Sequence, residues 1–361
     1  MLTPNQQARA KDLFVQALER PPQHRASFIA ASGEDPAIQA EALSLLNQQP
    51  SPPVTTESIT EAGPGSLLAG QYRVLRKLGQ GGFGVAFLAE DLQTHGQKVV
   101  VKILLRDATS SAAWAARKFE EEAAALARIS HPNVVGLIRI GNLELLRLRD
   151  GRREQVTSPF LVMPYAEGEP LDRLIAAGPL ALPSAAGILR QLGGALEAAH
   201  ALRILHRDIK PSNVLLRRLP DGEFHVQLID FGIAGLMPED KNEAVTSHVA
   251  GTFHYMAPEQ MLGRTSPASD LYSFAVLAYR LLTGEAPFPP GAPVARAELP
   301  WKSARLLRPD LPEPVDRLLA AGLSYRPENR PAEIGRYAGD IATALTPNGP
   351  PPIPVPRPPR S

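Results

Sequence analysis

The spacing of apolar residues divides the chain into a helical start, a strand-rich middle and a helical second half. In the first 49 residues, apolar side chains recur at helical spacing, with turn signals at Pro21–Pro22 and at Gly33. From residue 72 to about 165 the apolar runs are short and strand-like, whereas a helical period dominates from 171 to about 345. Strands followed by helices predict an α+β fold in two lobes and argue against an alternating βαβ sheet.

Two stretches without apolar periodicity mark the domain boundaries. Residues 50–70 are rich in Pro, Ser, Thr and Gly, and residues 346–361 hold eight prolines and two arginines. We therefore predict an N-terminal helical segment over residues 1–49, a flexible linker over 50–70, one compact domain over 71–345 and a disordered Pro-rich tail over 346–361.

Composition and charge exclude several classes of protein. Lys and Arg (38) almost balance Asp and Glu (37), so a nucleic-acid binder driven by bulk charge is not expected. The chain has no cysteine, which excludes disulfides, thiolate-bound zinc and thiol catalysis. No apolar run approaches the ~18–20 residues that cross a bilayer, and the N-terminus is polar where a signal peptide is apolar. We expect a cytoplasmic chain without nucleic-acid partners or a membrane span of its own; membrane attachment would require a longer protein.

A glycine-rich segment joins the first two predicted strands, residues 72–78 and 85–88. It contains Gly79, Gly81 and Gly84, with Phe83 between the last two glycines. Glycines at this spacing allow backbone amides to approach a phosphate closely, because no Cβ is in the way. A flexible hairpin turn would show the same pattern, so this motif alone leaves both interpretations open.

A lysine on the next strand is a candidate phosphate ligand. Lys102 shares a strand face with the apolar residues Val100 and Leu104. It can hold phosphates, or it can extend along the strand edge to water as most lysines do. Glu122 lies on the following predicted helix, on the face of Phe119, and would supply a carboxylate partner; a run of three glutamates is also typical of a solvated helix face.

The strongest signal for chemistry is a pair of aspartates at the two ends of a predicted hairpin. Asp208 lies in the segment 206–213, and Asp230 follows the second apolar run after a turn at Pro220–Gly222. Two carboxylates and the amide of Asn213 suit phosphoryl transfer. One acid orients a hydroxyl nucleophile, while Asn213 and Asp230 offer the hard oxygen ligands that Mg²⁺ prefers.

The order of these motifs resembles that of the protein kinases, over roughly residues 72–345. The glycine-rich segment, Lys102, Glu122, the Asp208 loop and the Asp230 motif are followed by Met256–Glu259. The resemblance implies the two-lobed protein-kinase fold, with a small β-rich N-lobe (about 71–163) and a larger helical C-lobe (about 167–345) after a short N-terminal helical extension. Lys210 resembles the serine/threonine class, and the N-terminal helices resemble those of bacterial (Hanks-type) kinases.

This resemblance also implies roles for individual residues. Lys102, paired with Glu122, would hold the α- and β-phosphates of ATP, and Asp208 would be the catalytic base. Lys210 would neutralise the γ-phosphate, while Asn213 and Asp230 bind Mg²⁺. The positions implied for nucleotide binding are Gly79, Gly81, Phe83, Gly84, Ala86, Val100, Lys102, Met163, Pro164 and Ala166.

Two departures from the family pattern lie in the nucleotide pocket. Pro164 stands where many relatives carry glutamate, but the family uses the carbonyl of this residue and the N–H two residues later, here Ala166. Ala86 and Val100 have exchanged the large and small side chains usual at the two positions that cover the adenine. We expect the pocket to keep its width, because the exchange conserves volume.

The remaining implied roles are structural and regulatory. Asp270 would anchor the catalytic loop, and Glu259 would form a buried ion pair with Arg330. Arg207 would bind a phosphate on the activation loop, residues 230–259, and the predicted sites of that phosphate are Thr246 and Ser247. Thr252 would position the substrate. All of these roles follow from the resemblance and from the residues at the matching positions.

The function implied is transfer of the γ-phosphate of Mg-ATP to Ser or Thr hydroxyls of protein substrates. Self-association for trans-autophosphorylation stays open. Two alternatives remain: a pseudokinase scaffold, which would normally have lost one of the catalytic groups retained here, and a small-molecule phosphotransferase, which usually lacks the Met256–Glu259 motif. Extra residues between Gly141 and Ser158 predict a long basic hairpin, to which the sequence assigns no role.

Overall fold

A computed structural model of the chain describes eight continuous stretches and several isolated positions. The stretches are residues 22–48, 54–55, 61–81, 84–104, 126–149, 152–231, 254–288 and 301–346, and the isolated positions are 6, 9–10, 13, 16–17, 59 and 123. The chain divides into two compact units, Met1–Ile59 with Glu144–Val156, and Thr60–Leu143 with Thr157–Ser361.

The smaller unit contains two complete helices, α2 (Pro22–Ala30) and α3 (Pro36–Gln48). Asp35 begins α3, because its carboxylate accepts a hydrogen bond from the N–H of Ala37 at 2.8 Å. A small apolar core is formed by Ala10, Leu13, Ala17, Ile29, Ile38 and Ala42. In the same unit, β1 (Val54–Thr55) pairs in parallel with residues 145–146. β1 lies within residues 50–70, whose composition predicts a linker.

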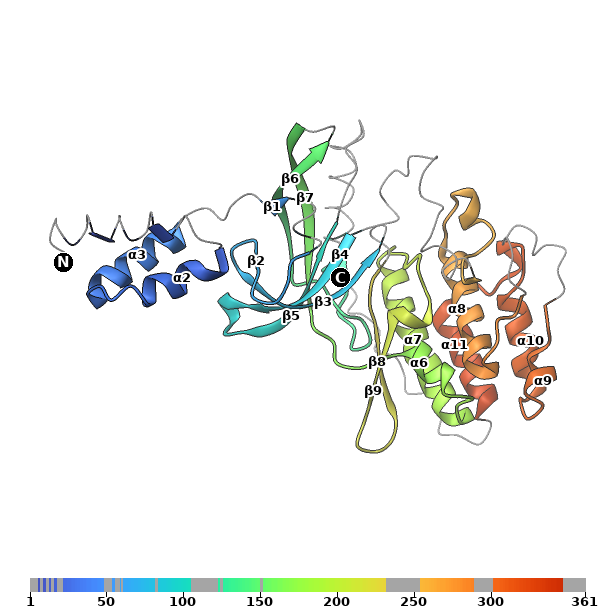
Figure 1. Cartoon of the computed structure of the whole chain (residues 1–361). Coiled ribbons are helices and arrows are strands. Elements are labelled where there is room, and N and C mark those ends of the chain that lie inside the picture. Colours follow the sequence, from blue (N-terminus) through green and yellow to red (C-terminus); the bar gives the residue numbers. More distant parts are fainter. Residues whose placement is uncertain are drawn as a thin grey trace, which may run out of the picture. The chain divides into compact units, whose positions relative to one another are not determined.

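Most of a sheet forms the first half of the larger unit (Figure 1), and residues 144–149 and 152–156 of its strands belong to the smaller unit. Its strands are ordered β6-β7-β5-β4-β3-β2, and their bounds are Leu67–Leu68 (β2), Tyr72–Gly81 (β3), Gly84–Asp91 (β4), Gln97–Ile103 (β5), Arg139–Arg149 (β6) and Arg152–Pro164 (β7). β3 pairs antiparallel with β4, β4 with β5, and β5 with β7. β6 and β7 are the strands of the hairpin predicted from residues 141–158.

Strand alternation gives this sheet one buried face and one half-buried face. Side chains of Phe87, Val99 and Val101 are buried, whereas the intervening Val100 and Lys102 are half-buried. Gly84 begins β4 with φ +142°, and a Cβ at this position would lie 2.0 Å from the carbonyl oxygen of Ile103. Only glycine can therefore bring β4 this close to β5.

The structure differs from the sequence prediction at the start of the sheet. Residues 61–70, whose composition predicts a linker, contribute β2, and Leu68 is buried opposite Tyr72. The turn between β2 and β3 is tight, with positive φ at Ala69 and Gly70. A strand of two residues is too short to show periodicity, so only its pairing with β3 reveals it.

Helices dominate the second half of the larger unit, as the α+β prediction requires, and that prediction is confirmed. The helices are α6 (Leu171–Ala176), α7 (Leu182–Ala201), α8 (Pro267–Thr283), α9 (Ala304–Leu307), α10 (Glu313–Gly322) and α11 (Ile334–Leu345). Figure 1 shows α7, α8, α10 and α11 side by side. α8 is buried along most of its length and is the centre of this core.

Three short strands and one 3₁₀ turn connect α6 and α7 to the site described below. β8 (Glu169–Pro170), β9 (Val214–Arg218) and β10 (Phe224–Leu228) form a small antiparallel sheet, and the turn η2 (Pro211–Asn213) precedes β9. None of the helices in the described part of the chain is both long and apolar enough to cross a bilayer.

Candidate active site

The segment 206–213 between α7 and β9 is held by one buried carboxylate. Asp270, in the first turn of α8 and 2% exposed, accepts hydrogen bonds from the backbone N–H groups of His206 and Arg207, each at 2.8 Å. The same carboxylate also contacts the ring of His200, whose Nε2 lies 2.8 Å from Asp270 Oδ2. Arg207 has φ +65°, which a residue with a Cβ rarely adopts. Asp270 therefore fixes a strained turn of the loop.

His206 is a neutral link between this loop and the segment that carries Asp230. Its Nδ1 accepts a hydrogen bond from the N–H of Asp208 (3.3 Å), and its Nε2 donates to the carbonyl of Ile229 (3.0 Å). Burial lowers the pKa of His206, against the opposing effect of Asp270 and the other nearby carboxylates. A protonated ring would lose its acceptor for Asp208, so the neutral form suits this position.

Asp208 has one hydrogen-bonded carboxylate oxygen and one without a described partner. Oδ2 accepts from Lys210 Nζ at 2.8 Å and from Asn213 Nδ2 at 3.0 Å. Asn213 Nδ2 also donates to the backbone carbonyl of Asp208 at 2.8 Å. Oδ1 is buried and has no hydrogen-bond partner within the part of the chain that the structure describes. A buried oxygen without a partner is costly unless a ligand satisfies it.

Lys102 and Asp230 meet across the site. Lys102 Nζ on β5 lies 2.8 Å from Asp230 Oδ1, and the two side chains are 23% and 37% exposed. Asp230 has φ +57°, a second strained position in the site. The partner predicted for Lys102, Glu122, lies outside the described residues.

Asn213 and Asp230 fit a Mg²⁺ ion by their chemistry. The amide nitrogen of Asn213 faces Asp208, which leaves its side-chain oxygen for another ligand, and Asp230 uses only one carboxylate oxygen for Lys102. Mg²⁺ is usually bound by one or two such groups together with phosphates and water. Clusters of three or more His, Cys, Asp or Glu that could hold a metal alone are absent from the described residues.

A small apolar cavity of about 30 Å³ lies behind the Lys102–Asp230 pair. It is lined by Lys102, Leu104, Leu126, Val135, Gly136, Leu137, Leu161, Met163, Asp230 and Phe231. Sequence reasoning found the lysine, the aspartate and Met163 but missed the aliphatic residues. An apolar residue that lines a pocket gives the same periodic signal as one in the core.

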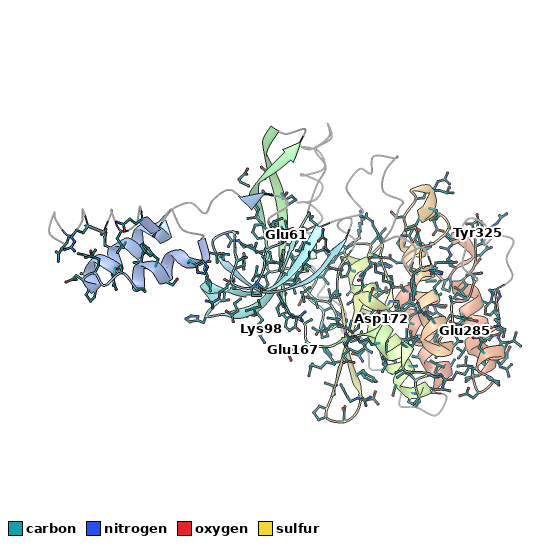
Figure 2. The ribbon with its side chains drawn as sticks, viewed as in Figure 1. Glu61, Lys98, Glu167, Asp172, Glu285 and Tyr325 are labelled. Atoms are coloured by element: carbon teal, nitrogen blue, oxygen red, sulfur yellow. The ribbon has the colours of Figure 1, made fainter. Side chains whose placement is uncertain are left out.

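The predicted nucleotide-binding positions gather on the half-buried face of the sheet. Ala86 lies opposite Lys102, and Val100 lies opposite Met163. Gly79, Gly81 and Gly84 lie at the β3–β4 turn, whereas Phe83 falls outside the described residues. Pro164 ends β7, and Ala166 follows. Between them, Tyr165 donates its N–H to the carbonyl of Lys98 on β5. Figure 2 labels Lys98 and also Glu167, the residue after Ala166.

Arg330 and Glu259 form a buried ion pair beneath the site. The Arg330 side chain is 0% exposed and donates to both carboxylate oxygens of Glu259, at 2.7 and 3.0 Å. Its other donors bond to the carbonyls of Ser324, Tyr325 and Ala268, so all five N–H groups are used. Burial would raise the pKa of Glu259, but hydrogen bonds from Arg330 and Ser269 hold it below the usual value.

Two residues of the site carry no signal in a single sequence. His200 contacts the carboxylate of Asp270. Gln260 connects the segment 254–260 to the segment 206–213. Gln260 Nε2 donates to the carbonyl of Arg207 (3.1 Å), while its Oε1 accepts from the N–H of Ala257 (3.0 Å). A lone histidine at a helix end or a lone glutamine belongs to no spacing pattern, so only the fold shows their partners.

The predicted regulatory and substrate-positioning residues fall outside the described part of the chain. They are Thr246, Ser247 and Thr252. Their roles stay predictions.

Comparison with known proteins places the sequence in one family. The family described as "Protein kinase domain" matches residues 72–335. The chain is 40% identical to the serine/threonine-protein kinase Pkn2 of Myxococcus xanthus over 229 residues, which cover 62% of this chain and 26% of Pkn2. It is 35% identical to PknA of Mycobacterium tuberculosis (80% and 64%) and 32% identical to PrkC of Bacillus subtilis (78% and 41%). The chain therefore spans between a quarter and two thirds of these relatives.

Solved structures show the same fold. The PknI kinase domain of Mycobacterium tuberculosis, a double mutant, superposes with a TM-score of 0.58 at 25% identity and covers 79% of this chain and 99% of its own. Rad53 in complex with AMP-PNP, at 23% identity and a TM-score of 0.58, shares the fold over 75% of this chain and 65% of its own. The matched family, the named relatives and the geometry around Asp208 agree: the chain belongs to the protein kinase family, in its bacterial (Hanks-type) serine/threonine branch.

Proposed function

We propose that this chain is an active serine/threonine protein kinase, which transfers the γ-phosphate of ATP to Ser and Thr hydroxyls of proteins. The observation that carries the proposal is the state of Asp208. Lys210 and Asn213 hold one of its carboxylate oxygens, and the other is buried without a partner among the described residues. This acceptor without a partner suits a substrate hydroxyl.

Asp208 acts as the base in the transfer. The hydroxyl donates its hydrogen bond to Oδ1 of Asp208, and its oxygen attacks the γ-phosphorus in line with the leaving group. The proton passes to the carboxylate while the bond from the γ-phosphorus to the bridging oxygen breaks, which releases ADP. Lys210 is placed to neutralise charge on the transferred group, because its ammonium lies 2.8 Å from Oδ2 of the same carboxylate.

The sheet positions the nucleotide. Lys102 would hold the α- and β-phosphates beside Asp230, with Glu122 as its second partner, and the backbone of the glycine-rich segment, including Phe83, would cover them. Asn213 and Asp230 would bind Mg²⁺, which supplies positive charge to the phosphates when bound.

The adenine would lie against the half-buried face of the sheet, between Ala86 and Val100, and would bond to the connection after β7. There the carbonyl of Pro164 would accept and the N–H of Ala166 would donate. Within the described residues, the N–H of Ala166 makes no hydrogen bond to another backbone group, which leaves it available to a ligand.

Activation would depend on a phosphate bound near the catalytic loop. Arg207 is next to Asp208, and a guanidinium matches a phosphate with two parallel hydrogen bonds. We infer that Thr246, or Ser247 beside it, receives this phosphate by autophosphorylation, and that Thr252 positions the substrate. Self-association would bring one copy's loop to the other's active site.

The test is incubation of the purified chain with Mg-ATP, followed by mass spectrometry of the chain and of a generic basic protein. We expect phosphate on Thr246 or Ser247 and on the protein substrate. Asp208→Asn should reduce transfer by roughly 10²- to 10⁴-fold and leave nucleotide binding largely intact. Asp221→Asn makes the same chemical change at the exposed turn between β9 and β10, so this matched control should behave as wild type. Transfer only to a small molecule, or full transfer by Asp208→Asn, would contradict the proposal.

A further inference from the structure

The hydrogen-bond partner of Arg280 is a neutral phenol. Arg280 lies in the last turn of α8 and is partly buried. Its guanidinium donates to the phenol oxygen of Tyr255 at 2.5 Å and lies 5.9 Å from the centre of that ring. Arg330 and Arg308, by contrast, pair with carboxylates. No carboxylate of the described residues lies within ion-pair distance of Arg280.

Tyr255 does not neutralise this charge. Burial raises the pKa of the Tyr255 phenol, while Arg280 lowers it and Asp172 raises it; the net direction is upward. The phenol therefore stays protonated at ordinary pH. The positive charge of the partly buried Arg280 is therefore not neutralised by its partner, and a bound anion would neutralise it.

Tyr255 links this cation to the segment 206–213. Tyr255 belongs to the segment 254–260, which Gln260 ties to the carbonyl of Arg207, the residue before Asp208. Asp172, whose charge acts on the Tyr255 phenol, is on α6 (Figure 2), and α6 packs against η2 at the other end of the same loop. The segment 254–260 and α6 thus connect the surroundings of Tyr255 to both ends of the loop that carries Asp208.

The chemistry of the guanidinium defines what it can bind. Arginine has five N–H donors in a planar fork, and among the described residues this side chain makes one hydrogen bond, to Tyr255. The remaining donors match a carboxylate or a phosphate, both of which accept two parallel hydrogen bonds.

We propose that Arg280 is a specificity-determining residue that binds an anionic side chain of the protein substrate and disfavours lysine or arginine at the same substrate position. This inference rests on the proposed function, since it concerns the substrate of that site. The anion is a carboxylate or a phosphate. The exposed carboxylate of Asp172, the other charged group that acts on Tyr255, weakens the preference by its opposite charge.

A peptide series tests this assignment. Each peptide carries one acceptor Ser or Thr and has Glu, phosphoserine, Gln or Lys at one flanking position in turn. Wild type should favour Glu or phosphoserine over Lys at one position by roughly tenfold in kcat/KM, since hydrogen bonds to charged groups are worth about that much. Arg280→Glu should invert the preference at this position only, and Arg280→Gln should abolish it. The Glu and phosphoserine peptides separate a carboxylate ligand from a phosphate ligand.

Matched variants separate recognition of the anion from support of Tyr255. Tyr255→Phe removes the hydrogen bond but leaves the cation, so the preference for anions should persist. Asp172→Asn should strengthen it. Arg317→Glu reverses a charge on the exposed surface of α10, where the side chain is 71% exposed, and should leave the preference unchanged. Equal preferences in wild type and Arg280→Glu would overturn the proposal, as would loss of preference in Tyr255→Phe with the cation intact.

Peptide binding keeps this proposal distinct from the proposed function. The affinities of the Glu and Lys peptides are measured by fluorescence anisotropy on the Asp208→Asn variant, with and without Arg280→Glu. If no chain transfers phosphate but the affinities still exchange with Arg280→Glu, the anion site stands and the kinase activity fails. If transfer occurs and neither affinity nor kcat/KM responds to residue 280, the anion site fails alone. Unfolding temperatures of all variants show whether a loss comes from the fold.

Discussion

The segment 206–213 and the half-buried face of the sheet, to which we assign catalysis and nucleotide binding, hold their side chains by different means. On the loop side, Asp270 and Arg330 are 2% and 0% exposed, and each is satisfied by several hydrogen bonds. On the sheet side, Lys102 is presented by the backbone ladder of β5, and its described ion pair to Asp230 is partly open to solvent.

The two arrangements predict effects on different properties: on stability for the loop side and on activity for the sheet side. Removal of one partner from a buried, fully bonded pair leaves an uncompensated charge or polar group in the core. Removal of a partly exposed charge leaves a group that water can still reach. We therefore expect residues that hold the loop to dominate stability, and residues that contact the nucleotide to affect activity with little change in stability.

The largest effect on stability should come from Arg330→Met. Methionine leaves Glu259 buried without its cation, which typically costs about 3–5 kcal/mol of unfolding free energy. Chemical denaturation measures the change. Arg317→Met breaks an exposed pair with Glu313 and serves as the control, for which we expect a loss of about 0.5 kcal/mol or less. A loss below about 1 kcal/mol in Arg330→Met would remove the proposed contrast between the two regions.

Acidification should weaken the loop side next. Burial holds the pKa of His206 below its ordinary value of 6.5, so below pH 6.5 the unfolded chain binds a proton that the folded chain does not. The contribution of His206 to the unfolding free energy is therefore complete above pH 6.5. Below pH 6.5 it decreases by up to ~1.4 kcal/mol per pH unit. His131 and His225, whose pKa values burial also lowers, add to the slope. The unfolding free energy of wild type and His206→Gln between pH 5 and 8 isolates the contribution of His206, and identical slopes would refute it.

On the sheet side, we expect a smaller effect, confined to nucleotide affinity. Val100→Ala should weaken ATP binding by about 1 kcal/mol, because it opens space on the half-buried face near Ala86. Ala86→Val should crowd the same face, and the double change should restore much of the affinity. Isothermal titration with ATP measures the cycle. Val99→Ala removes the same atoms from the buried face and should reduce stability instead; a cycle without coupling would show that residues 86 and 100 do not share the adenine surface.

The smallest change in stability should follow Lys102→Gln, although it removes a residue assigned to ATP. The pair with Asp230 is partly solvated, so we expect less than about 1 kcal/mol of lost unfolding free energy together with loss of phosphate transfer. Arg73→Gln, which breaks the exposed pair with Glu90, should cost a similarly small amount and leave transfer intact. A loss of several kcal/mol in Lys102→Gln would show that the sheet side is as tightly coupled to the fold as the loop.

Several features of the fold and the site could be predicted from the sequence because their signals are local. The strand and helix periods predicted the α+β class, and the turn at Pro220–Gly222 predicted the hairpin between Asp208 and Asp230. β2 could not be predicted, since two residues show no period. The contacts of His200 and Gln260 were also out of reach, because each depends on a partner dozens of residues away.

The sequence by itself determined the family, the order of the motifs and which residue types are available for phosphoryl transfer. Only the tertiary structure decided how those groups are charged and bonded. Folding buries the pair Arg330–Glu259 and keeps the ring of His206 neutral. It leaves one oxygen of Asp208 without a partner among the described residues, and it places Arg280 against the phenol of Tyr255 instead of a described carboxylate. The reason is physical. The strength and protonation of a polar group depend on its burial and its partners, and both are set by packing between segments that the order of residues alone does not bring together.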